Sequence, residues 1–261
     1  MKISVVIPVY NGEKYIADCL KSLQAQTFGD FECLCVDNGS TDKTAEIIAG
    51  FAARDARIKY AESNRADKQS GARNKGLELA EGEYVTYVDA DDYVHPQMLE
   101  LLLTVMEREN ADVVGCGFEK TEKPYDGNFG RISVVKTTVY DNPFAAFLTK
   151  RKIFVSACTR LYKRSFLIGK KFINGISFED VPWSFSVFAE IKRYVLIKAP
   201  LYYYYFNPDS TMRSDWSDEK TRSYITVIRT VDAYTKAKMP AEQKRVQKRV
   251  LNQRVKMILN R

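Results

Sequence analysis

Apolar runs and helical periodicities alternate along the first 118 residues of the chain. Short runs of β-branched and other apolar residues predict strands, and stretches with apolar residues three or four positions apart predict helices. The expected strands are Ile3–Val9, Phe31–Val36, Ile58–Ala61, Tyr84–Val88 and Val113–Phe118. The expected helices are Glu13–Gln26, Lys43–Ala53, Gly71–Leu79 and Pro96–Glu109. This alternation predicts an α/β fold, Rossmann-like, with an open, mostly parallel sheet and helices on both faces.

The pattern changes in the second part of the chain. Residues 119–145 resemble a hairpin or a loop, and residues 146–205 mix helical with aromatic-rich segments. The aromatic run Leu201–Phe206 is interpreted as a strand with half of its rings in the core, rather than as a sugar-stacking platform. We therefore expect one domain over residues 1–215 and a C-terminal helical segment over residues 216–261.

The net charge of +7 is concentrated at the C-terminal end. Residues 236–261 carry nine Lys or Arg against one Glu, so the other 235 residues have a net charge of −1. Nucleic acid is therefore not an expected partner. In a helix, Arg245 and Lys256 would share a polar face, with Val246 and Ile258 on the apolar arc. Such a helix either docks on its own domain or lies on an anionic lipid surface.

The residue counts restrict the chemistry. A single histidine, His95, excludes any site that needs two imidazoles within one chain, and its position beside a proline favours a solvated or helix-capping role. Five irregularly spaced cysteines indicate free buried thiols in a reducing compartment. With no run of about 18 apolar residues and no signal peptide, a cytoplasmic protein is expected. Catalysis must rest on carboxylates, Lys, Arg, Tyr or an oxygen-bound metal.

Acidic residues follow two of the predicted strands. Asp37 ends the second strand, and the sequence Asp89-Ala90-Asp91-Asp92 ends the fourth. Ligands of parallel α/β sheets bind outside the carboxyl ends of the strands. Carboxylates at such an edge provide the oxygen ligands that Mg²⁺ or Mn²⁺ prefers.

Several short motifs follow one another along the chain. They are SVVIPVYN from Ser4, QTF from Gln26, VDNGSTD from Val36, ARNKG from Ala72, GEY from Gly82, DADD from Asp89, LYKR from Leu161 and FED from Phe178. In this order and spacing they resemble the family 2 glycosyltransferases, which are nucleotide-sugar-dependent enzymes with the GT-A fold. The resemblance covers roughly residues 1–215 and is specific in its combined order. It implies a nucleotide-binding half at 1–118 and an acceptor half at 119–215.

The resemblance implies a nucleotide-sugar pocket in which side chains at the ends of the strands contact the nucleotide. The family usually has two aspartates where this chain has Asp37 and Asn38, so the departure at Asn38 leaves a uracil base plausible while the nucleotide identity stays open. Arg73 either meets the nucleotide or forms a structural ion pair with an active-site carboxylate. The implied pocket residues are Pro8, Tyr10, Asn11, Asp37, Asn38, Lys68, Arg73, Asp89, Ala90 and Arg213.

The resemblance also implies the metal ligands and the catalytic base. Asp91 would bind Mn²⁺ or Mg²⁺ directly, with Asp92 in support. Asp180 would take the proton of the attacking hydroxyl, and apolar neighbours would raise its pKa. Arg213 would lie in a segment that closes over the diphosphate.

The expected function is that of an inverting, metal-dependent glycosyltransferase. It would move a sugar from a nucleotide-sugar, with UDP as the expected nucleotide, to a hydroxyl of a glycan or a lipid-linked glycan in surface-polysaccharide synthesis. The basic tail would then bring the protein to the inner face of the membrane. The alternatives are a catalytically silent nucleotide-sugar-binding subunit and a nucleotidyltransferase, although the latter would carry a glycine-rich loop where PVYNGEKY stands.

Overall fold

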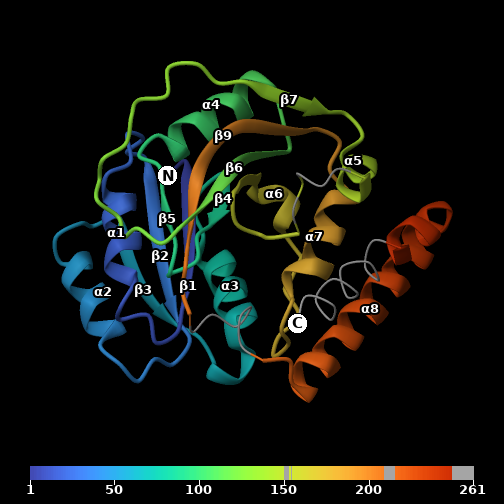
Figure 1. Cartoon of the computed structure of the whole chain (residues 1–261), viewed down its shortest axis with the longest axis horizontal. Coiled ribbons are helices and arrows are strands. Elements are labelled where there is room, and N and C mark those ends of the chain that lie inside the picture. The colour runs from blue at the N-terminus through green and yellow to red at the C-terminus, as the bar shows by residue number, and fades with distance from the viewer. Residues whose placement is uncertain (150–152, 154, 209–214, 249–261) are drawn as a thin grey trace.

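The strands of the described residues form one sheet between two layers of helices (Figure 1). The computed structural model describes residues 1–149, 153, 155–208 and 215–248. The strands are β1 (Ile3–Val9), β2 (Phe31–Asp37), β3 (Ile58–Glu62), β4 (Tyr84–Tyr87), β5 (Tyr93–Val94), β6 (Val113–Thr121), β7 (Thr137–Tyr140), β8 (Arg160–Lys163) and β9 (Tyr194–Tyr205). The helices are α1 (Ile16–Gln24), α2 (Thr44–Ala52), η1 (Arg65–Asp67), α3 (Lys68–Leu79), α4 (Met98–Arg108), α5 (Pro143–Thr149), α6 (Arg164–Leu167), α7 (Asp180–Phe188), α8 (Asp218–Lys238) and η2 (Pro240–Glu242).

The first half of the sheet is parallel, with strand order β3-β2-β1-β4. Every residue of β1 and β2 is buried, as the apolar run of Ile3–Val9 predicted for β1. Helices α1 and α2 lie on one side of these strands and α3 on the other (Figure 1). Gly76 lets α3 approach β1 closely, because a Cβ at this position would lie 2.3 Å from Cγ1 of Val6.

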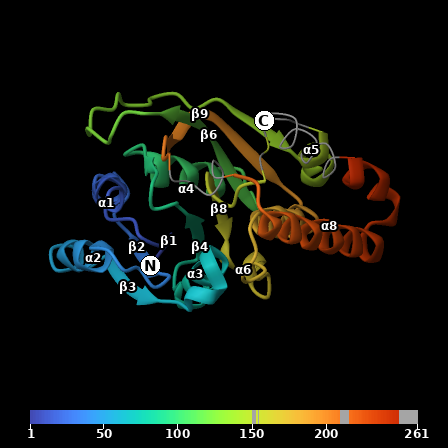
Figure 2. The ribbon, with the colours of Figure 1, turned by 60° about the horizontal axis from the view of Figure 1, so that its bottom comes forward.

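The second half of the sheet mixes parallel and antiparallel pairs. Strand β8 pairs antiparallel with both β4 and β6, whereas β6 pairs parallel with β9. Figure 2 shows β6 and β9 side by side across the molecule. The aromatic run is a strand, as predicted, but β9 begins already at Tyr194. Strands β5 and β8 were not predicted, because two and four residues are too few for a periodic signal.

Helix α7 is fixed to the sheet by an aromatic cluster around Trp183. The Trp183 ring stacks on Phe172 with centroids 4.5 Å apart and an interplanar angle of 11°. Tyr87 of β4 and Tyr162 of β8 meet the same ring edge-on, at 5.7 and 5.3 Å. Offset and edge-to-face ring pairs add about 0.5–1.5 kcal/mol each beyond the burial of area. The N-terminus of α7, at Asp180, is therefore held at a defined place above the sheet.

The C-terminal segment packs on the domain. Helix α8 lies along α7 and buries Tyr224, Val227 and Val231 (Figure 2). After η2 the chain turns back, and Val246 is buried at 1% exposure. This packing fits the docked interpretation of the tail up to residue 248, and residues 249–261 lie outside the described part. Within the described residues, the structure contains no helix with the length and hydropathy needed to cross a bilayer.

The cysteines and the histidine are structural. All five cysteines are free and buried, as expected. His95 is also buried, at 4% exposure, so the solvated alternative is wrong. Its Nδ1 accepts a hydrogen bond from the Gln97 N–H at 3.1 Å, which is a helix-capping role at the start of α4. Burial lowers the pKa of His95 below its ordinary value.

Candidate active site

The predicted site residues emerge at one edge of the sheet. Val9 at the end of β1 lies opposite Asp37 at the end of β2, and the Val88 N–H donates to the Val6 carbonyl at 3.0 Å, which extends β4 alongside β1. The loops after all three strands therefore start at the same edge. This is the edge at which parallel α/β sheets bind ligands.

Asp37 and Asn38 are buried and fasten the loops around them. Oδ1 of Asp37 accepts hydrogen bonds from the N–H and the hydroxyl of Ser40, at 2.9 and 2.6 Å. The amide group of Asn38 donates to Ser63 Oγ at 3.0 Å and to the Asn64 carbonyl at 2.7 Å. Because both amide hydrogens are used inside the protein, the group that Asn38 offers a ligand is its oxygen. An imide N–H, as in uracil, can donate to such an oxygen.

Tyr10 is exposed at the rim of the site, with 43% of its surface accessible. The guanidinium of Arg65 lies 3.5 Å from the centroid of its ring, so one ring face is already covered by a cation. Asn11 ties the two loops together, because its Oδ1 accepts the Thr41 N–H at 2.9 Å. Pro8 is buried within β1, one residue before the end of the strand.

The three aspartates after β4 have different surroundings. Both oxygens of Asp92 accept hydrogen bonds from β9, one from the Tyr202 hydroxyl at 2.5 Å and one from the Tyr205 N–H at 2.9 Å. Burial, followed by the neighbouring acidic charges, holds the pKa of Asp92 well above its ordinary value. Asp91 is half-buried and accepts a hydrogen bond from the Asn207 amide at 2.9 Å. Ala90, between Asp89 and Asp91, is also half-buried.

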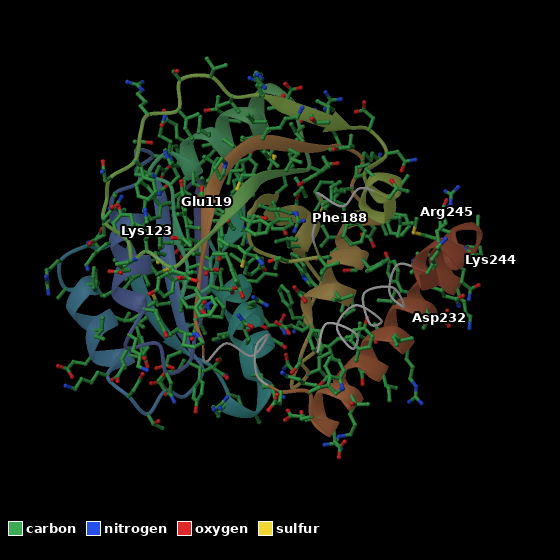
Figure 3. The ribbon with its side chains drawn as sticks, in the orientation of Figure 1. Glu119, Lys123, Phe188, Asp232, Lys244 and Arg245 are labelled. Carbon is green, nitrogen blue, oxygen red and sulfur yellow. The ribbon has the colours of Figure 1, made fainter. Side chains whose placement is uncertain are left out.

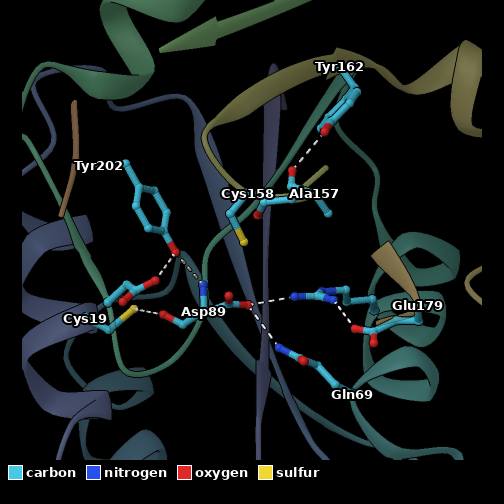
Figure 4. Close-up of polar contacts among 11 residues, drawn as sticks. Cys19, Gln69, Asp89, Ala157, Cys158, Tyr162, Glu179 and Tyr202 are labelled. Atoms are coloured by element: carbon cyan, nitrogen blue, oxygen red, sulfur yellow. Dashed lines mark hydrogen bonds and ion pairs between the residues drawn. The ribbon is translucent and has the colours of Figure 1, made fainter. Parts of the chain in front are cut away.

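Arg73 connects the acidic loop to the start of α7, because it pairs with both Asp89 and Glu179, which are labelled in Figure 4. Its Nη2 lies 2.8 Å from Oδ1 of Asp89, and its Nη1 lies 2.5 Å from Oε1 of Glu179. Gln69 donates to the same Asp89 oxygen at 3.0 Å. Arg73 is 4% exposed. Its two buried contacts correspond to the structural ion pair, which was one of the two roles predicted for it.

Asp180 follows Glu179 and opens α7. Desolvation by burial, and then the charge of Glu179, raises the pKa of Asp180 to about 7, while Arg73 opposes the shift. A carboxylate whose pKa lies near the working pH is suited to general base catalysis. Asp180, a carboxylate with a raised pKa, therefore follows directly after Glu179, which Arg73 links to Asp89 in the acidic loop.

Two further pocket residues were predicted, Lys68 and Arg213. Lys68 points to the C-terminal helix, where its Nζ pairs with Glu219 in the first turn of α8. Arg213 lies outside the described residues.

Three residues around the site have a positive φ although they are not glycines: Asn11 at 46°, Lys68 at 54° and Phe178 at 65°. Such backbone conformations are rare in L-residues and collect at functional sites.

The acidic loop suits a hard divalent cation. In the described residues no three His, Cys, Asp or Glu side chains are arranged as a complete cage. Mg²⁺ sites in nucleotide-dependent enzymes use one or two carboxylates and complete the shell with phosphates and water, so a cage is not required. Asp91 offers one carboxylate at this edge, and Asp92 is held behind it by Tyr202. The residues present therefore fit Mn²⁺ or Mg²⁺.

Four residues of the site were not predicted from the sequence to have these roles. Glu179 pairs with Arg73, Arg65 covers Tyr10, and Asn207 joins Asp91 to the Tyr15 hydroxyl, which donates to Asn207 Oδ1 at 3.2 Å. Tyr202 was expected only as a strand residue, and it holds Asp92. No periodic signal in the tyrosine run singles out Tyr202, because its neighbour Leu201 is also buried and Tyr203, Tyr204 and Tyr205 are all half-buried.

The sheet, the acidic loop after β4 and the carboxylate at the start of α7 define a glycosyltransferase of the GT-A type. The sequence profile described as glycosyl transferase family 2 matches residues 4–169. The chain therefore belongs to glycosyl transferase family 2, as its motifs predicted. The matched residues include the whole acidic loop but end before α7.

Relatives and solved structures agree with this class. The glycosyltransferase EpsJ of Bacillus subtilis is 34% identical over 218 residues, which are 80% of this chain and 62% of EpsJ. The poly(ribitol-phosphate) beta-N-acetylglucosaminyltransferase TarS of Staphylococcus aureus is 30% identical over 214 residues, which are 78% of this chain and 35% of TarS. The crystal structure of TarS in complex with UDP-GlcNAc superimposes with a TM-score of 0.73 at 25% identity, covering 88% of this chain and 66% of that one. These findings confirm the expected fold and enzyme class.

Proposed function

We propose that this protein transfers a sugar from a UDP-sugar to a hydroxyl group of a glycan, with inversion at the anomeric carbon. The observation that carries the proposal is the bridge formed by Arg73. It joins Asp89, in the acidic loop, to Glu179, the neighbour of Asp180. Asp89, with its proposed role toward the ribose of the donor, and Asp180, with its proposed role as proton acceptor, are thereby held in one connected site. The TarS structure with bound UDP-GlcNAc supports a UDP-sugar as the donor class.

Asp180 is the proposed catalytic base. It takes the proton of the acceptor hydroxyl while the hydroxyl oxygen forms a bond to C1 of the sugar. The bond between C1 and the diphosphate oxygen breaks on the opposite face, and its electron pair leaves with the nucleoside diphosphate. A pKa of about 7 keeps Asp180 ionised often enough to act and basic enough to accept the proton.

Asp91 is the proposed direct ligand of Mn²⁺ or Mg²⁺, and Asp92 supports it from behind. When bound, the metal neutralises charge on the departing diphosphate. Asn207 orients the Asp91 carboxylate through a hydrogen bond of 2.9 Å, and Tyr202 fixes Asp92. Ligand carboxylates that are held by such hydrogen bonds keep one orientation, which favours metal affinity.

The nucleotide is proposed to lie over the ends of β1 and β2. Tyr10 offers the base its exposed ring, and Asn38 offers an amide oxygen, with Asp37 holding the loop below. Pro8, Asn11 and Ala90 are proposed to line this pocket as predicted. Lys68 and Arg213 keep their proposed roles toward the diphosphate, with Lys68 held by Glu219 in the described structure.

The acceptor is proposed to be a surface glycan or its lipid-linked precursor. The described part of the tail places Lys244 and Arg245 at the outer end of α8, away from the sheet (Figure 3). Each cation near an anionic surface contributes about 1 kcal/mol. We expect the protein to co-sediment with vesicles containing anionic lipid at low salt and not with neutral vesicles. Equal sedimentation with both vesicles would contradict an electrostatic membrane contact.

The function is tested by UDP titration calorimetry with and without Mn²⁺, followed by a hydrolysis screen of nucleotide sugars. We expect Mn²⁺-dependent UDP binding and turnover of at least one UDP-sugar. Asp180→Asn should lower kcat about 10²–10⁴-fold with donor binding unchanged. Asp126→Asn is the matched control, because Asp126 is an exposed carboxylate in the loop before β7. Binding without turnover of any donor would favour a nucleotide-sugar-binding subunit, and unchanged kcat in Asp180→Asn would remove Asp180 as the base.

A further inference from the structure

The start of α8 contacts the loop that carries the proposed base. The Trp216 ring stacks on Phe178, with centroids 5.8 Å apart and an interplanar angle of 22°. Tyr224, two turns into α8, meets the same Phe178 ring edge-on at 5.8 Å. The Ser177 N–H donates to Ser223 Oγ at 3.1 Å. The two residues of the loop nearest Glu179 are therefore held from the C-terminal segment.

Phe178 needs such support because its backbone is in the left-handed region, with φ at 65°. A bulky aromatic residue adopts this conformation rarely, and it persists only where the surroundings impose it. The Phe178 carbonyl accepts the Val181 N–H at 3.2 Å, so the first turn of α7 is built on this residue. The direction in which Asp180 leaves the backbone thus depends on the conformation of Phe178.

The same end of α8 also reaches the first residue of α3, because Glu219 pairs with Lys68. The Trp216 ring is itself oriented by its Nε1–H, which donates to Thr221 Oγ1 at 2.8 Å. The beginning of α8 and the residue Trp216 just before it therefore contact both the start of α3, which carries Arg73, and the loop before α7.

We propose that Trp216 is a positioning residue for the transfer reaction, which aims Asp180 at the acceptor hydroxyl by holding Phe178 in its left-handed conformation. Trp216 acts through Phe178 and is not itself a catalytic residue. The inference rests on the proposed function, in which Asp180 is the base. It makes the C-terminal helix a working part of the active site rather than an appendage.

The test compares Trp216→Ala and Trp216→Phe with the wild-type chain in Mn²⁺-dependent hydrolysis of UDP-GlcNAc. A displacement of a catalytic group by about 1 Å can cost about 100-fold in rate, so we expect kcat to fall about 10- to 100-fold in Trp216→Ala. The KM for UDP-GlcNAc and the Kd for UDP should stay within about twofold, because the donor pocket is unchanged. Trp216→Phe retains a ring for stacking and should recover most of kcat.

Tyr234→Ala is the matched control in the same C-terminal segment. Tyr234 is an aromatic residue of α8 whose hydroxyl donates to Glu190 at 3.2 Å, about three turns beyond Tyr224. We expect this variant to lose stability but keep the wild-type kcat at a temperature where it is folded. Wild-type kcat in Trp216→Ala, or equal losses in Trp216→Ala and Tyr234→Ala, would overturn the proposal.

A second measurement does not need activity. Arg73, Glu179 and Asp89 are the charged groups that act on Asp180. The Asp180→Asn substitution is made both in the wild-type chain and in Trp216→Ala, and the free energy of unfolding of all four proteins is measured against pH. If Trp216 keeps Asp180 desolvated, the effect of Asp180→Asn on stability should vary with pH in the wild-type chain and should vary less in Trp216→Ala. An unchanged pH dependence would overturn the positioning role. Failure of the wild-type chain to turn over UDP-GlcNAc would exclude UDP-GlcNAc as its donor, and this stability measurement would then decide the role of Trp216.

Discussion

Nη1 of Arg73 lies 2.5 Å from Oε1 of Glu179, 106 positions further along the chain, and both side chains are buried. The other arm of the same guanidinium binds Asp89. Nε of Arg73 has no hydrogen-bond partner among the described residues. One side chain thereby fixes the distance between the acidic loop and the start of α7, and it does so at the cost of one unpaired buried N–H group.

Arg73→Met should destabilise the protein strongly. Removing one partner of a buried ion pair leaves an uncompensated charge and typically costs about 3–5 kcal/mol. Urea unfolding measures the loss, with Arg57→Met as the control, because the Arg57–Asp55 pair is more exposed and should be worth less than about 1 kcal/mol. Adding Glu179→Leu to Arg73→Met should restore part of the stability. Equal stability of the two single variants would contradict the role of Arg73.

Asn207→Ala should weaken Mn²⁺-dependent UDP binding, because the Asp91 carboxylate loses the amide that orients it. Loss of a group that orients a metal ligand typically costs 10–100-fold in affinity, and we expect about tenfold here. Calorimetry with and without Mn²⁺ separates this effect from nucleotide binding. Asn174→Ala is the control, since Asn174 is an exposed amide whose partner is Asn74. An equal loss without Mn²⁺ would place Asn207 at the nucleotide instead of the metal.

Tyr202→Phe should destabilise the acidic loop without disturbing the strand. The hydroxyl of Tyr202 donates to Asp92 and accepts the Asp89 N–H at 3.1 Å, so its removal leaves two buried groups short of a partner. The expected loss is about 1–3 kcal/mol in thermal or urea unfolding. Tyr203→Phe on the same strand should cost less than about 0.5 kcal/mol. Equal losses of stability in the two variants would contradict a specific contribution of the Tyr202 hydroxyl to the stability of the acidic loop.

Stability should depend on pH through Asp180. Its pKa is raised to about 7 in the folded protein, so the folded state binds a proton that the unfolded chain releases near pH 4. The free energy of unfolding of the wild-type chain should therefore fall as the pH rises from about 4 to 7, because the buried Asp180 carboxyl loses its proton in this range. A tenfold change in proton affinity corresponds to about 1.4 kcal/mol, so Asp180→Asn should gain about 1–3 kcal/mol relative to wild type between pH 5 and pH 8. Urea unfolding at both pH values measures this gain, and a constant difference would contradict the raised pKa.

The first half of the fold was predictable because its signals are local. Strand β1 has the predicted bounds, and β2 and β3 are one residue longer than predicted. Strands β1 and β2 are buried on both faces and are rich in apolar residues, whereas β3 at the edge of the sheet buries only Ile58 fully. The second half was less predictable. Strand β8 is four residues long and is defined by its neighbours β4 and β6, not by a pattern of its own.

The acidic residues at the edge of the sheet could be located from the sequence, but their contacts could not. Asp37, Asp89 and Asp91 could be found because each follows a strand. The partners of the acidic residues could not, because Tyr202 lies 110 positions from Asp92 and Glu179 lies 106 positions from Arg73. Periodicity describes which face a residue occupies, and it carries no information on which distant side chain will meet it.

Strand β9 also bears on how the protein is made. It leaves the ribosome after the other described strands, yet it supplies both donors that hold Asp92 and pairs with β5, β6 and β7. Chains fold from the N-terminus during synthesis, and pairings between distant segments form slowly. A nascent chain that has emerged only as far as β8 therefore carries its acidic loop in water. Burial of Asp92 becomes a late step that coincides with closure of the sheet, so the acidic loop does not reach the arrangement described above before nearly the whole domain has been translated.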